Sequence, residues 1–391
     1  MMTEQRTIVL AVTAARSLAL MEGMPEYLRD RGWAVHVVCS GGPQAAALGA
    51  RAGVTVHELP MSRQPRPIAD AVALARWVRL LRTIRPDVVS SGTPKAALLG
   101  MVAARFARVP TRIYVLRGLR LESVKSKLGK SVLASVERVT VGCATSVLAV
   151  SPSLLAKAVD LKLVPRDKIS VIGAGSSNGV DVERFAAAAA DQESVQSLRL
   201  SLGIREDVPV IGFVGRLTMD KGLATLAAAR QILVDRGVDH QLLLIGSVDG
   251  VRQSDLIHTL ISVGRPASVT GHVLDTSGYY PLMDLLCLPT LREGFPNVIL
   301  EAAAAGVPSV TTTATGAIDA VVHGTTGLVC PVGDAQAFAE SIARLLALPA
   351  DERHDLGANA QRRALERFDR EAHWERLHEY VQNCANTAQP N

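Results

Sequence analysis

The stretch LLCLPTLREGFPNVILEAAAAGVPSVTT, from Leu285 to Thr312, decides the fold. It opens with four consecutive apolar residues, Leu285–Leu288, passes through a polar loop into the alanine- and leucine-rich segment Asn297–Ala305, and ends in Ser309–Thr312. Continuous apolar runs are typical of strands that are buried on both faces, whereas Ala, Leu and Glu favour a helix. Gly306 is a typical residue for the end of that helix. The stretch therefore predicts a strand–helix–strand unit of a parallel sheet.

Strands and helices of this kind alternate along the whole chain. The alternation predicts an α/β protein whose parallel sheets are covered by helices on both faces. Because 391 residues exceed one ordinary domain, we expect two doubly wound, Rossmann-like domains that face a central cleft. The predicted strands are Thr7–Val12, Ala34–Cys39, Val54–Glu58, Val88–Ser90, Thr111–Val115, Ser146–Val150, Lys168–Ile172, Val210–Val214, Gln241–Ile245, Ser268–Thr270, Leu285–Leu288, Ser309–Thr312 and Gly327–Val329. The predicted helices include Met24–Arg31, Pro67–Arg82, Lys95–Ala107, Leu223–Arg236, Asn297–Ala305 and Ala335–Ala347.

The domain boundary is expected near Gly179, because an Asn-Gly dipeptide marks a turn there. We divide the chain into an N-terminal domain (1–180), a C-terminal domain (181–365) and a C-terminal helix (366–391). One option is that this C-terminal helix crosses back and packs on the N-terminal domain. The alanine run Ala186–Ala190 is interpreted as a short low-complexity linker.

Charge divides the chain at the same place. Residues 1–180 carry 25 Lys and Arg against 11 Asp and Glu, a net charge of +14, whereas residues 181–391 carry 17 against 26, a net charge of −9. This asymmetry predicts two units with different partners. A hydrophobic content of 48% excludes a disordered chain. The five cysteines lie at least 43 positions apart, which excludes a disulfide scaffold or a zinc cluster and fits reduced thiols in the cytoplasm.

The basic half fits a nucleic acid, an anionic membrane surface or an acceptor that carries a diphosphate. An aromatic content of only 4% and the lack of a nucleic-acid-binding motif disfavour the first. In the densest basic stretch, 117–138, apolar residues recur at spacings of three and four, which predicts one amphipathic helix: Leu121, Val124, Leu128, Val132 and Val136. This helix either packs with a solvated basic face or lies on a membrane. No apolar run approaches the roughly 18 residues of a membrane span. We therefore expect a cytoplasmic protein, with peripheral attachment to the inner face of the plasma membrane as an option.

Two loops contain candidate binding residues. Glu293 precedes the helix that opens at Pro296, which is expected in its first turn, and Glu301 lies within that helix. A helix N-terminus suits a diphosphate, and carboxylates accept hydrogen bonds from sugar hydroxyls. Arg216 and Lys221 lie in a short loop after a predicted strand, a common place to hold an anion. By themselves, the two glutamates fit a solvated helix face better, and the two cations fit a phosphate site or ordinary solvation equally well.

Taken together, the two loops resemble the retaining glycosyltransferases of family 4, which have the GT-B fold. Glu293 and Glu301 form the E-x7-E pattern of that family, and the resemblance is strong over about residues 145–345. Further segments that carry it are GRLTMDKG from Gly215, TGAID from Thr315, GLV from Gly327 and SSNGVD from Ser176. In the first half, TPKAALLG from Thr93 and YVLRG from Tyr114 resemble a bacterial branch that acts in capsule, exopolysaccharide or lipid-linked oligosaccharide synthesis.

The resemblance implies a nucleotide-sugar donor, with UDP favoured, and a saccharide or polyprenyl-diphosphate-linked acceptor. It makes residues 1–180 the acceptor-binding domain and residues 181–365 the nucleotide-sugar-binding domain. It implies no metal, no cofactor and no nucleic acid as partner. By motif position, Arg216 and Lys221 hold the diphosphate, Glu301 takes the ribose hydroxyls, and Glu293 takes the donor sugar. The candidate catalytic residues are therefore Arg216, Lys221 and Glu293. The other candidate donor-binding residues are Gly215, His272, Val273, Gly294, Phe295, Pro296, Asn297 and Val298; those on the acceptor side are Thr93, Lys95 and Arg117.

The chain departs from this branch at the end of one predicted strand. Relatives carry histidines just before the Thr-Pro-Lys segment, where this chain has Ser90, Ser91 and Gly92. The resemblance implies a front-face reaction, in which the acceptor hydroxyl approaches from the face that the nucleotide leaves and no dedicated base is required. The activity expected is therefore that of a retaining hexosyltransferase. Two other functions remain open: a nucleotide-sugar epimerase or hydrolase on the same fold, and a non-catalytic subunit that binds a nucleotide-sugar.

Overall fold

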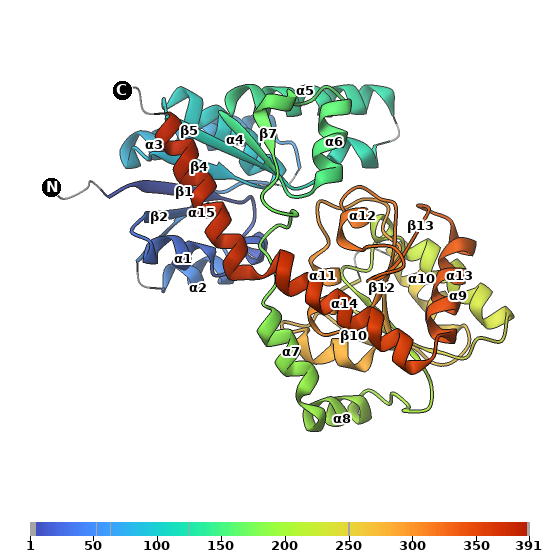
Figure 1. Cartoon of the computed structure of the whole chain (residues 1–391). Coiled ribbons are helices and arrows are strands. Elements are labelled where there is room, and N and C mark those ends of the chain that lie inside the picture. The colour runs from blue at the N-terminus through green and yellow to red at the C-terminus, as the bar shows by residue number, and fades with distance from the viewer. Residues whose placement is uncertain (1–4, 52, 63, 125, 249–250, 389–391) are drawn as a thin grey trace. The chain divides into compact units, whose positions relative to one another are not determined.

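The computed structural model describes residues 5–51, 53–62, 64–124, 126–248 and 251–388, which form two compact units (Figure 1). Unit 1 comprises Met1–Asn178 and Ala372–Asn391, and unit 2 comprises Gly179–Glu371. Each unit is a parallel sheet with helices packed on it, which confirms the predicted α/β class and the two Rossmann-like domains. No helix among the described residues has both the length and the apolar content to cross a membrane.

Unit 1 contains a seven-stranded sheet in the order β3-β2-β1-β4-β5-β6-β7. Its strands are β1 (Thr7–Ala11), β2 (Ala34–Cys39), β3 (Val54–Glu58), β4 (Val88–Ser91), β5 (Thr111–Leu116), β6 (Ser146–Ala149) and β7 (Ile169–Ser170). Its α-helices are α1 (Met24–Asp30), α2 (Pro43–Gly49), α3 (Pro67–Ile84), α4 (Pro94–Phe106), α5 (Lys127–Cys143), α6 (Pro152–Asp160) and most of α15 (Arg370–Thr387). Short 3-10 turns are η1 (Ala15–Met21), η2 (Arg120–Ser123) and η3 (Arg166–Lys168).

Unit 2 contains a six-stranded sheet in the order β10-β9-β8-β11-β12-β13. Its strands are β8 (Val210–Val214), β9 (Gln241–Ile245), β10 (Ser268–Gly271), β11 (Leu285–Leu288), β12 (Ser309–Thr312) and β13 (Gly327–Cys330). Its α-helices are α7 (Val182–Ala190), α8 (Gln192–Ser201), α9 (Leu223–Asp235), α10 (Val251–Ser262), α11 (Asn297–Ala304), α12 (Ala317–Ala320), α13 (Ala335–Ala347) and α14 (Ala350–Phe368). Its 3-10 turns are η4 (Met219–Lys221) and η5 (Ser277–Leu282).

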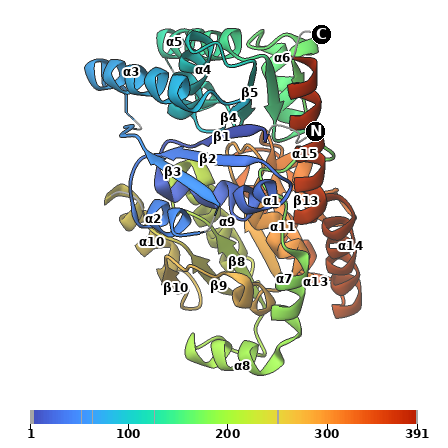
Figure 2. The ribbon, with the colours of Figure 1, turned by 90° about the vertical axis from the view of Figure 1, so that its left-hand side faces the viewer.

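The strand order of each sheet reverses direction at one point. The chain winds outward from β1 through β2 and β3, then returns to place β4 on the other side of β1; in unit 2 the same reversal separates β8 from β11. Right-handed crossovers then place the helices of the two directions on opposite faces. Figures 1 and 2 show α1 and α2 on one face of the first sheet and α3, α4 and α5 on the other. Ligands of such sheets bind at the carboxyl ends of the strands that flank the reversal.

The central strands of unit 2 are buried on both faces, which explains why continuous apolar runs in the sequence predicted them. Every residue of β8, β9, β11 and β12 is buried, as strands covered on both faces require. Two buried threonines of β12 satisfy their hydroxyls internally: Thr311 donates to the Leu288 carbonyl at 3.0 Å, and Thr312 donates to the Thr290 carbonyl at 2.6 Å. The sheet core therefore forms a rigid base for the loops at its carboxyl edge.

Several sequence predictions about elements were wrong. Ala186–Ala190 is not a linker but the end of α7, which Asp181 caps by accepting from the Arg184 amide at 3.1 Å. The stretch 117–138 is not one helix, because a new helix begins at Lys127, where Ser126 accepts from the Gly129 amide at 3.0 Å. The predicted strand Lys168–Ile172 shortens to the two residues of β7. Pro296 precedes α11 as its N-cap rather than lying in its first turn.

Candidate functional site

The candidate site of unit 2 is built on the two loops that flank the reversal of its sheet. The loop Gly215–Gly222 follows β8, and the loop Pro289–Pro296 follows β11 and leads into α11. Because β8 and β11 are neighbours in the sheet, these loops meet although about 70 residues separate them in sequence. The geometry therefore places both predicted motifs at the edge where doubly wound sheets bind their ligands.

The two motifs are joined by an ion pair. Lys221 Nζ donates to Glu293 Oε1 at 2.5 Å, and both side chains are largely buried, with 21% and 11% exposed. The Glu293 amide donates to the Thr315 carbonyl at 2.9 Å, which fixes the loop against the segment after β12. A charge-assisted pair of this kind holds both side chains in place and keeps each charge compensated.

Asp220, to which the sequence analysis gave no role, links the same two loops. Its carboxylate lies 3.6 Å from Arg292 and 4.0 Å from Arg216, and it accepts from the Thr218 hydroxyl at 2.6 Å. Its carbonyl accepts from the Leu291 amide at 3.0 Å. Desolvation opposes its ionisation, but the Thr218 hydrogen bond and the neighbouring cations hold the pKa of Asp220 below its usual range. Asp220 therefore remains ionised and orients cations of both loops.

Two glycines allow the loops to approach this closely. Gly222 has a φ of 80°, and a Cβ there would lie 1.7 Å from the Pro289 carbonyl oxygen. Gly316 has a φ of 78°, and a Cβ there would lie 2.3 Å from the Gly294 carbonyl oxygen. Only glycine adopts such conformations at little cost, and only glycine leaves room for the opposing backbone. Gly222 thus sets the spacing between the two loops, and Gly316 sets the spacing between the loop Pro289–Pro296 and the segment after β12.

Glu301 lies one and a half turns into α11 and is held by a separate set of hydrogen bonds. Its Oε2 accepts from the Tyr280 hydroxyl at 2.5 Å and from the Thr276 hydroxyl at 3.4 Å. Burial raises the pKa of Glu301 above its usual value, although these hydrogen bonds oppose the shift. Both bonds end on Oε2, so Oε1 keeps its capacity to accept. Sequence reasoning found Glu301 but missed Tyr280, which orients it.

The start of α11 presents backbone donors without a side-chain cap. Pro296 occupies the N-cap and makes no side-chain hydrogen bond to the first turn. The buried Oδ1 of Asn297 has no hydrogen-bond partner among the described residues. Phe295 is buried and packs against Phe368 with ring centroids 5.3 Å apart, so its side chain anchors the loop and only its backbone can meet a ligand. Val298 is half-buried in the first turn.

The loops after β9 and β10 continue the same edge. The Gly246 amide donates to the Gly271 carbonyl at 2.8 Å, and a Cβ on Gly246 would lie 1.9 Å from the carbonyl oxygen of Gly215. Beyond Gly271, His272 is exposed and Val273 is half-buried. The predicted residue Gly215 therefore lies on the loop after β8, and His272 and Val273 lie on the loop after β10, at the same edge of the sheet.

The candidate acceptor residues of unit 1 are already engaged with other protein groups. The Thr93 hydroxyl accepts from the Thr13 amide at 2.7 Å, and Lys95 pairs with Asp70. Arg117 donates through Nη1 to the Ser177 carbonyl at 3.2 Å, while its buried Nε has no hydrogen-bond partner among the described residues. Burial lowers the pKa of Arg117 to about 10. Within unit 1, the structure therefore places these three residues in separate contacts.

The departure at Ser90, Ser91 and Gly92 has a steric correlate. A Cβ on Gly92 would lie 2.7 Å from Arg117 Nε, so the missing side chain leaves the space that the guanidinium uses. A larger residue at this position would require Arg117 to move. Gly92, which follows β4, and Arg117, which follows β5, are therefore coupled in space.

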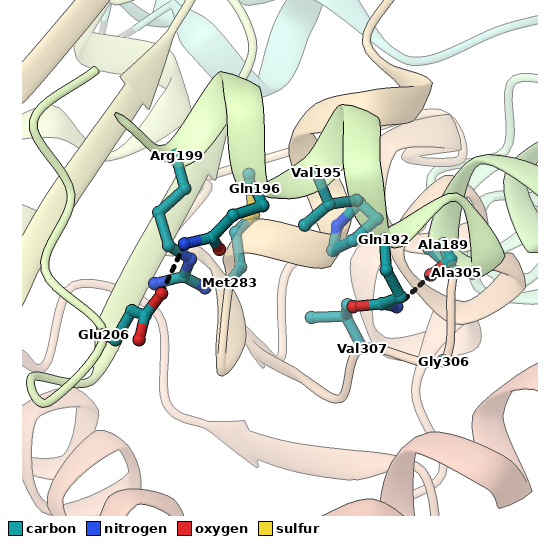
Figure 3. Close-up of a pocket in the computed structure, with 11 residues that line it drawn as sticks. Ala189, Gln192, Val195, Gln196, Arg199, Glu206, Met283, Ala305, Gly306 and Val307 are labelled. Carbon is teal, nitrogen blue, oxygen red and sulfur yellow. Dashed lines mark hydrogen bonds between the residues drawn. The ribbon is translucent and has the colours of Figure 1, made fainter. Parts of the chain in front are cut away.

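A pocket of about 450 Å³ in unit 2 lies at the opposite edge of the sheet (Figure 3). Its lining includes Met283 and Val307, which precede β11 and β12, and the side chains of Val195 and Gln196 on α8. Because the conserved geometry of doubly wound sheets places ligands at the carboxyl ends of strands, this pocket is separate from the candidate site. Across the described ranges, no group of three carboxylate, imidazole or thiol side chains is arranged to hold a metal ion.

Comparisons with known proteins agree with this arrangement of two units. The family model of the glycosyl transferases group 1 matches residues 208–348, and that of the glycosyl transferase 4-like domain matches residues 20–175. The capsular polysaccharide biosynthesis glycosyltransferase CapM of Staphylococcus aureus is 38% identical over 369 residues, which cover 94% of each chain. A UDP-Gal:alpha-D-GlcNAc-diphosphoundecaprenol alpha-1,3-galactosyltransferase of Escherichia coli is 28% identical over 283 residues, which cover 71% of each chain.

Solved structures show the same fold. HepE of Anabaena, in complex with UDP and glucose, superimposes with a TM-score of 0.78 at 21% identity, covering 96% of this chain and 99% of the other. A glycosyltransferase of Rickettsia africae superimposes with a TM-score of 0.79 at 19% identity, covering 98% and 99%. The similarity extends over both units of the chain.

Proposed function

Because this chain belongs to the group 1 glycosyltransferases of family 4, with the GT-B fold, we propose that it is a retaining hexosyltransferase of surface polysaccharide synthesis. It would transfer a sugar from a UDP-sugar to a saccharide linked to a polyprenyl diphosphate. The observation that carries the proposal is the Lys221–Glu293 pair at the sheet reversal, with Arg216 beside it. This pair brings a cation for phosphate and an acceptor for sugar hydroxyls to one point.

The donor site is assigned to unit 2. Arg216 and Lys221 bind the diphosphate together with the uncapped amides at the start of α11. Glu301 accepts from the ribose hydroxyls through Oε1, because Tyr280 and Thr276 occupy its Oε2. Glu293 accepts from hydroxyls of the donor sugar when Lys221 turns to the phosphate. HepE, which shares the fold, was solved with UDP and glucose, which supports a UDP-sugar as the donor.

The proposed chemistry follows the developing charge. The bond between the anomeric carbon and the phosphate oxygen breaks, and its electron pair stays on the diphosphate. The acceptor hydroxyl oxygen bonds to the anomeric carbon on the same face, and its proton passes to a phosphate oxygen of the leaving group. Arg216, Lys221 and the helix terminus stabilise the negative charge of the diphosphate as it grows. These cations do the work of a metal ion, so the proposed reaction is metal-independent.

The acceptor is assigned to unit 1 on the names of relatives and on charge. The Escherichia coli relative is named for a diphosphoundecaprenol acceptor, and CapM is named for capsular polysaccharide biosynthesis. Residues 1–180 have a net charge of +14, which suits a diphosphate-linked lipid at an anionic membrane. Thr93, Lys95 and Arg117 are the candidate acceptor residues. The protein is proposed to work in the cytoplasm at the inner face of the plasma membrane.

A donor screen followed by product analysis tests the proposal. UDP-sugars and GDP-sugars are compared for thermal stabilisation, because a ligand that binds only the folded state raises its melting temperature. The stabilising donor is then incubated with a lipid-linked saccharide extract, and the anomeric configuration of the product is read by NMR. We expect a UDP-hexose to stabilise the protein and the product to keep the donor configuration.

The remaining outcomes separate the other functions. Conversion of the donor without an acceptor would indicate an epimerase or a hydrolase. Stabilisation by a donor with no product from any acceptor extract would indicate a non-catalytic subunit. An inverted product would contradict the front-face reaction while leaving the transferase assignment intact. Lack of stabilisation by every nucleotide-sugar would contradict the donor site itself.

A further inference from the structure

Unit 1 contains a pocket of about 430 Å³ at the amino edge of its sheet, where the strands begin. The pocket lies between the ends of α3 and α4 and the turns that lead into β4 and β5. It is lined by Arg82, Arg85 and Arg108 and by apolar residues that include Leu81 and Val109. The candidate acceptor residues follow β4 and β5 instead, so this pocket lies at the opposite edge of the sheet.

The three arginines of this pocket have no counter-charge within the described part of the chain. None of Arg82, Arg85 and Arg108 pairs there with a carboxylate or donates to a carbonyl, and all three are exposed. The neighbouring Asp87 does not line the pocket, and its carboxylate accepts from the Thr7 amide at 2.7 Å. The pocket therefore offers three forked sets of N–H donors to an anion.

Two of these arginines occupy backbone positions that favour glycine. Arg85 has a φ of 52° and Arg108 has a φ of 59°, both just after the end of a helix. Glycine is the usual residue there, because a Cβ is disfavoured in the left-handed conformation. Pro86 and Pro110 follow the two arginines and restrict each turn further. The turns themselves would be better served by glycine, so they do not account for the arginines.

The helix ends do not account for the whole positive charge either. Each helix C-terminus carries about half a unit of negative charge, so two of them leave an excess of about two positive charges in this pocket. Arg112 covers nearby carbonyls: its Nη1 donates to Val109 at 2.5 Å and to Pro110 at 3.3 Å. Burial, and then repulsion from Arg105, lowers the pKa of Arg112. The surroundings of the pocket therefore remain positively charged.

We propose that this pocket binds a small, water-soluble molecule that carries two phosphate groups, as a diphosphate ester or a bisphosphate. The guanidinium groups of Arg82, Arg85 and Arg108 contact the phosphate oxygens in pairs of hydrogen bonds, and the apolar lining contacts the carbon skeleton. The volume suits a ligand of this size, since small-molecule pockets measure roughly 300–1,000 Å³. The inference goes beyond the function proposed above, because it places a second ligand away from the donor and acceptor loops.

Calorimetry with inorganic diphosphate at low salt tests the pocket. All titrations use the full chain with Lys221→Ala, which weakens the proposed donor site of unit 2. Adding Arg85→Gly and Arg108→Gly should weaken binding about 100-fold, since each charge-assisted contact contributes about tenfold. Because glycine suits both backbone positions, this variant should keep or raise the thermal midpoint. Unchanged affinity in this variant would overturn the proposal.

Lys162→Gly is the matched control. Lys162 is an exposed cation that follows α6, has a φ of 52° and lies outside the pocket. Its replacement removes one charge from unit 1 and relieves the same backbone conformation, so diphosphate should bind as it does without this change. A loss equal to that of the two arginine replacements would mean that only the general charge of unit 1 matters, which would overturn the proposal.

Hydrogen exchange read by mass spectrometry locates the bound anion. With the unmodified chain, diphosphate should slow exchange in peptides that cover residues 82–90 and 105–112. Protection confined to residues 215–222 and 293–301 would overturn this inference and leave the proposed donor site intact. Protection of the unit 1 peptides without any product from a nucleotide-sugar would instead refute the proposed function alone.

Two further probes test the chemistry of the ligand. Fructose 1,6-bisphosphate should bind at least as tightly as inorganic diphosphate, because its carbon skeleton reaches the apolar lining. Sulfate should bind at least about tenfold more weakly, because it carries fewer charges than the three arginines can compensate. Equal affinity for sulfate would indicate a general anion contact and overturn the proposal. Geranyl diphosphate binding more than about tenfold tighter than the bisphosphate would identify a lipid ligand and overturn the assignment to a soluble one.

Discussion

In unit 2, the loops that flank the sheet reversal meet through charged side chains, whereas in unit 1 the corresponding loops meet through two threonines. Lys221 pairs with Glu293 across β8 and β11. Across β1 and β4, the hydroxyls of Thr13 and Thr93 lie 2.8 Å apart. The same topology therefore produces an ionic site in the acidic unit and a neutral contact in the basic unit. Several cations of unit 1, such as Arg76, Arg79 and Arg138, are instead exposed on α3 and α5.

The largest effect on activity is expected from removing Lys221, the cation of the Lys221–Glu293 pair. Lys221→Ala should lower kcat by about 10²- to 10³-fold, because the lost stabilisation acts on charge that develops in the transition state. Steady-state kinetics with the identified donor measures this loss, and UDP affinity should fall much less. Lys95→Ala removes the lysine–carboxylate pair of unit 1 and should leave UDP affinity unchanged. A similar fall in UDP affinity for both variants would remove the distinction between the units.

The next effect concerns the close approach of the loops in unit 2. Gly222→Ala should destabilise this unit by about 3 kcal/mol, because the new Cβ meets the Pro289 carbonyl and the left-handed backbone is strained. Gly237→Ala is the matched control, since its φ is 71° but open space surrounds it; we expect about 1 kcal/mol. Urea denaturation, following the transition that UDP shifts, compares the two. Equal costs would mean that backbone strain alone matters.

A smaller effect is expected at the ribose position. Glu301→Ala should weaken UDP binding by about 1.5–3 kcal/mol, the contribution of hydrogen bonds to a charged acceptor. Calorimetry measures the change, with Glu183→Ala on α7 as a control for loss of one carboxylate in the same unit. Unchanged affinity for UDP in Glu301→Ala would show that the carboxylate holds Tyr280 and Thr276 but no nucleotide.

The smallest effect is a pH dependence that follows from the same carboxylate. An ordinary glutamate has a pKa of about 4.3. Burial raises the pKa of Glu301, so Glu301 becomes protonated at a higher pH than an ordinary glutamate does. Since the ionised form accepts hydrogen bonds more strongly, UDP affinity should fall several-fold as the pH decreases through this raised pKa. The ratio of affinities between the unmodified chain and Glu301→Gln isolates the effect, because ionisation of UDP is common to both. A ratio that does not change with pH would contradict the assignment.

Much of unit 2 could be predicted from sequence because its strands are short, apolar and buried on both faces. Leu285–Leu288, Ser309–Thr312 and Ala335–Ala347 were predicted with the bounds that the structure has. Periodicity failed where a cap, rather than hydrophobicity, sets an element. Ser126 starts a new helix inside a stretch that looks continuous, and Asp181 starts a helix that continues through the alanine run.

The residues of the site could be predicted, but their contacts could not. The motifs name Lys221 and Glu293, and only the neighbouring positions of β8 and β11 bring them together. Asp220 stood within the motif without a role, because its partners Arg292 and Leu291 lie on the other loop. Tyr280 gave no signal at all, since a tyrosine before an apolar strand is an ordinary core residue. Their roles in binding remain predictions.

The chain leaves unit 1 at Asn178 and supplies its last segment only from Ala372 onward. Within that segment, Trp374 donates to Asn178 Oδ1 at 2.9 Å, and its ring lies 5.3 Å from that of Tyr27. During synthesis on the ribosome, unit 2 is therefore finished first, although it is encoded second, while unit 1 waits for the final residues. A nascent polypeptide halted directly after Glu371 would carry all of unit 2 and an unfinished unit 1, which reverses the usual order in which domains mature from the N-terminus.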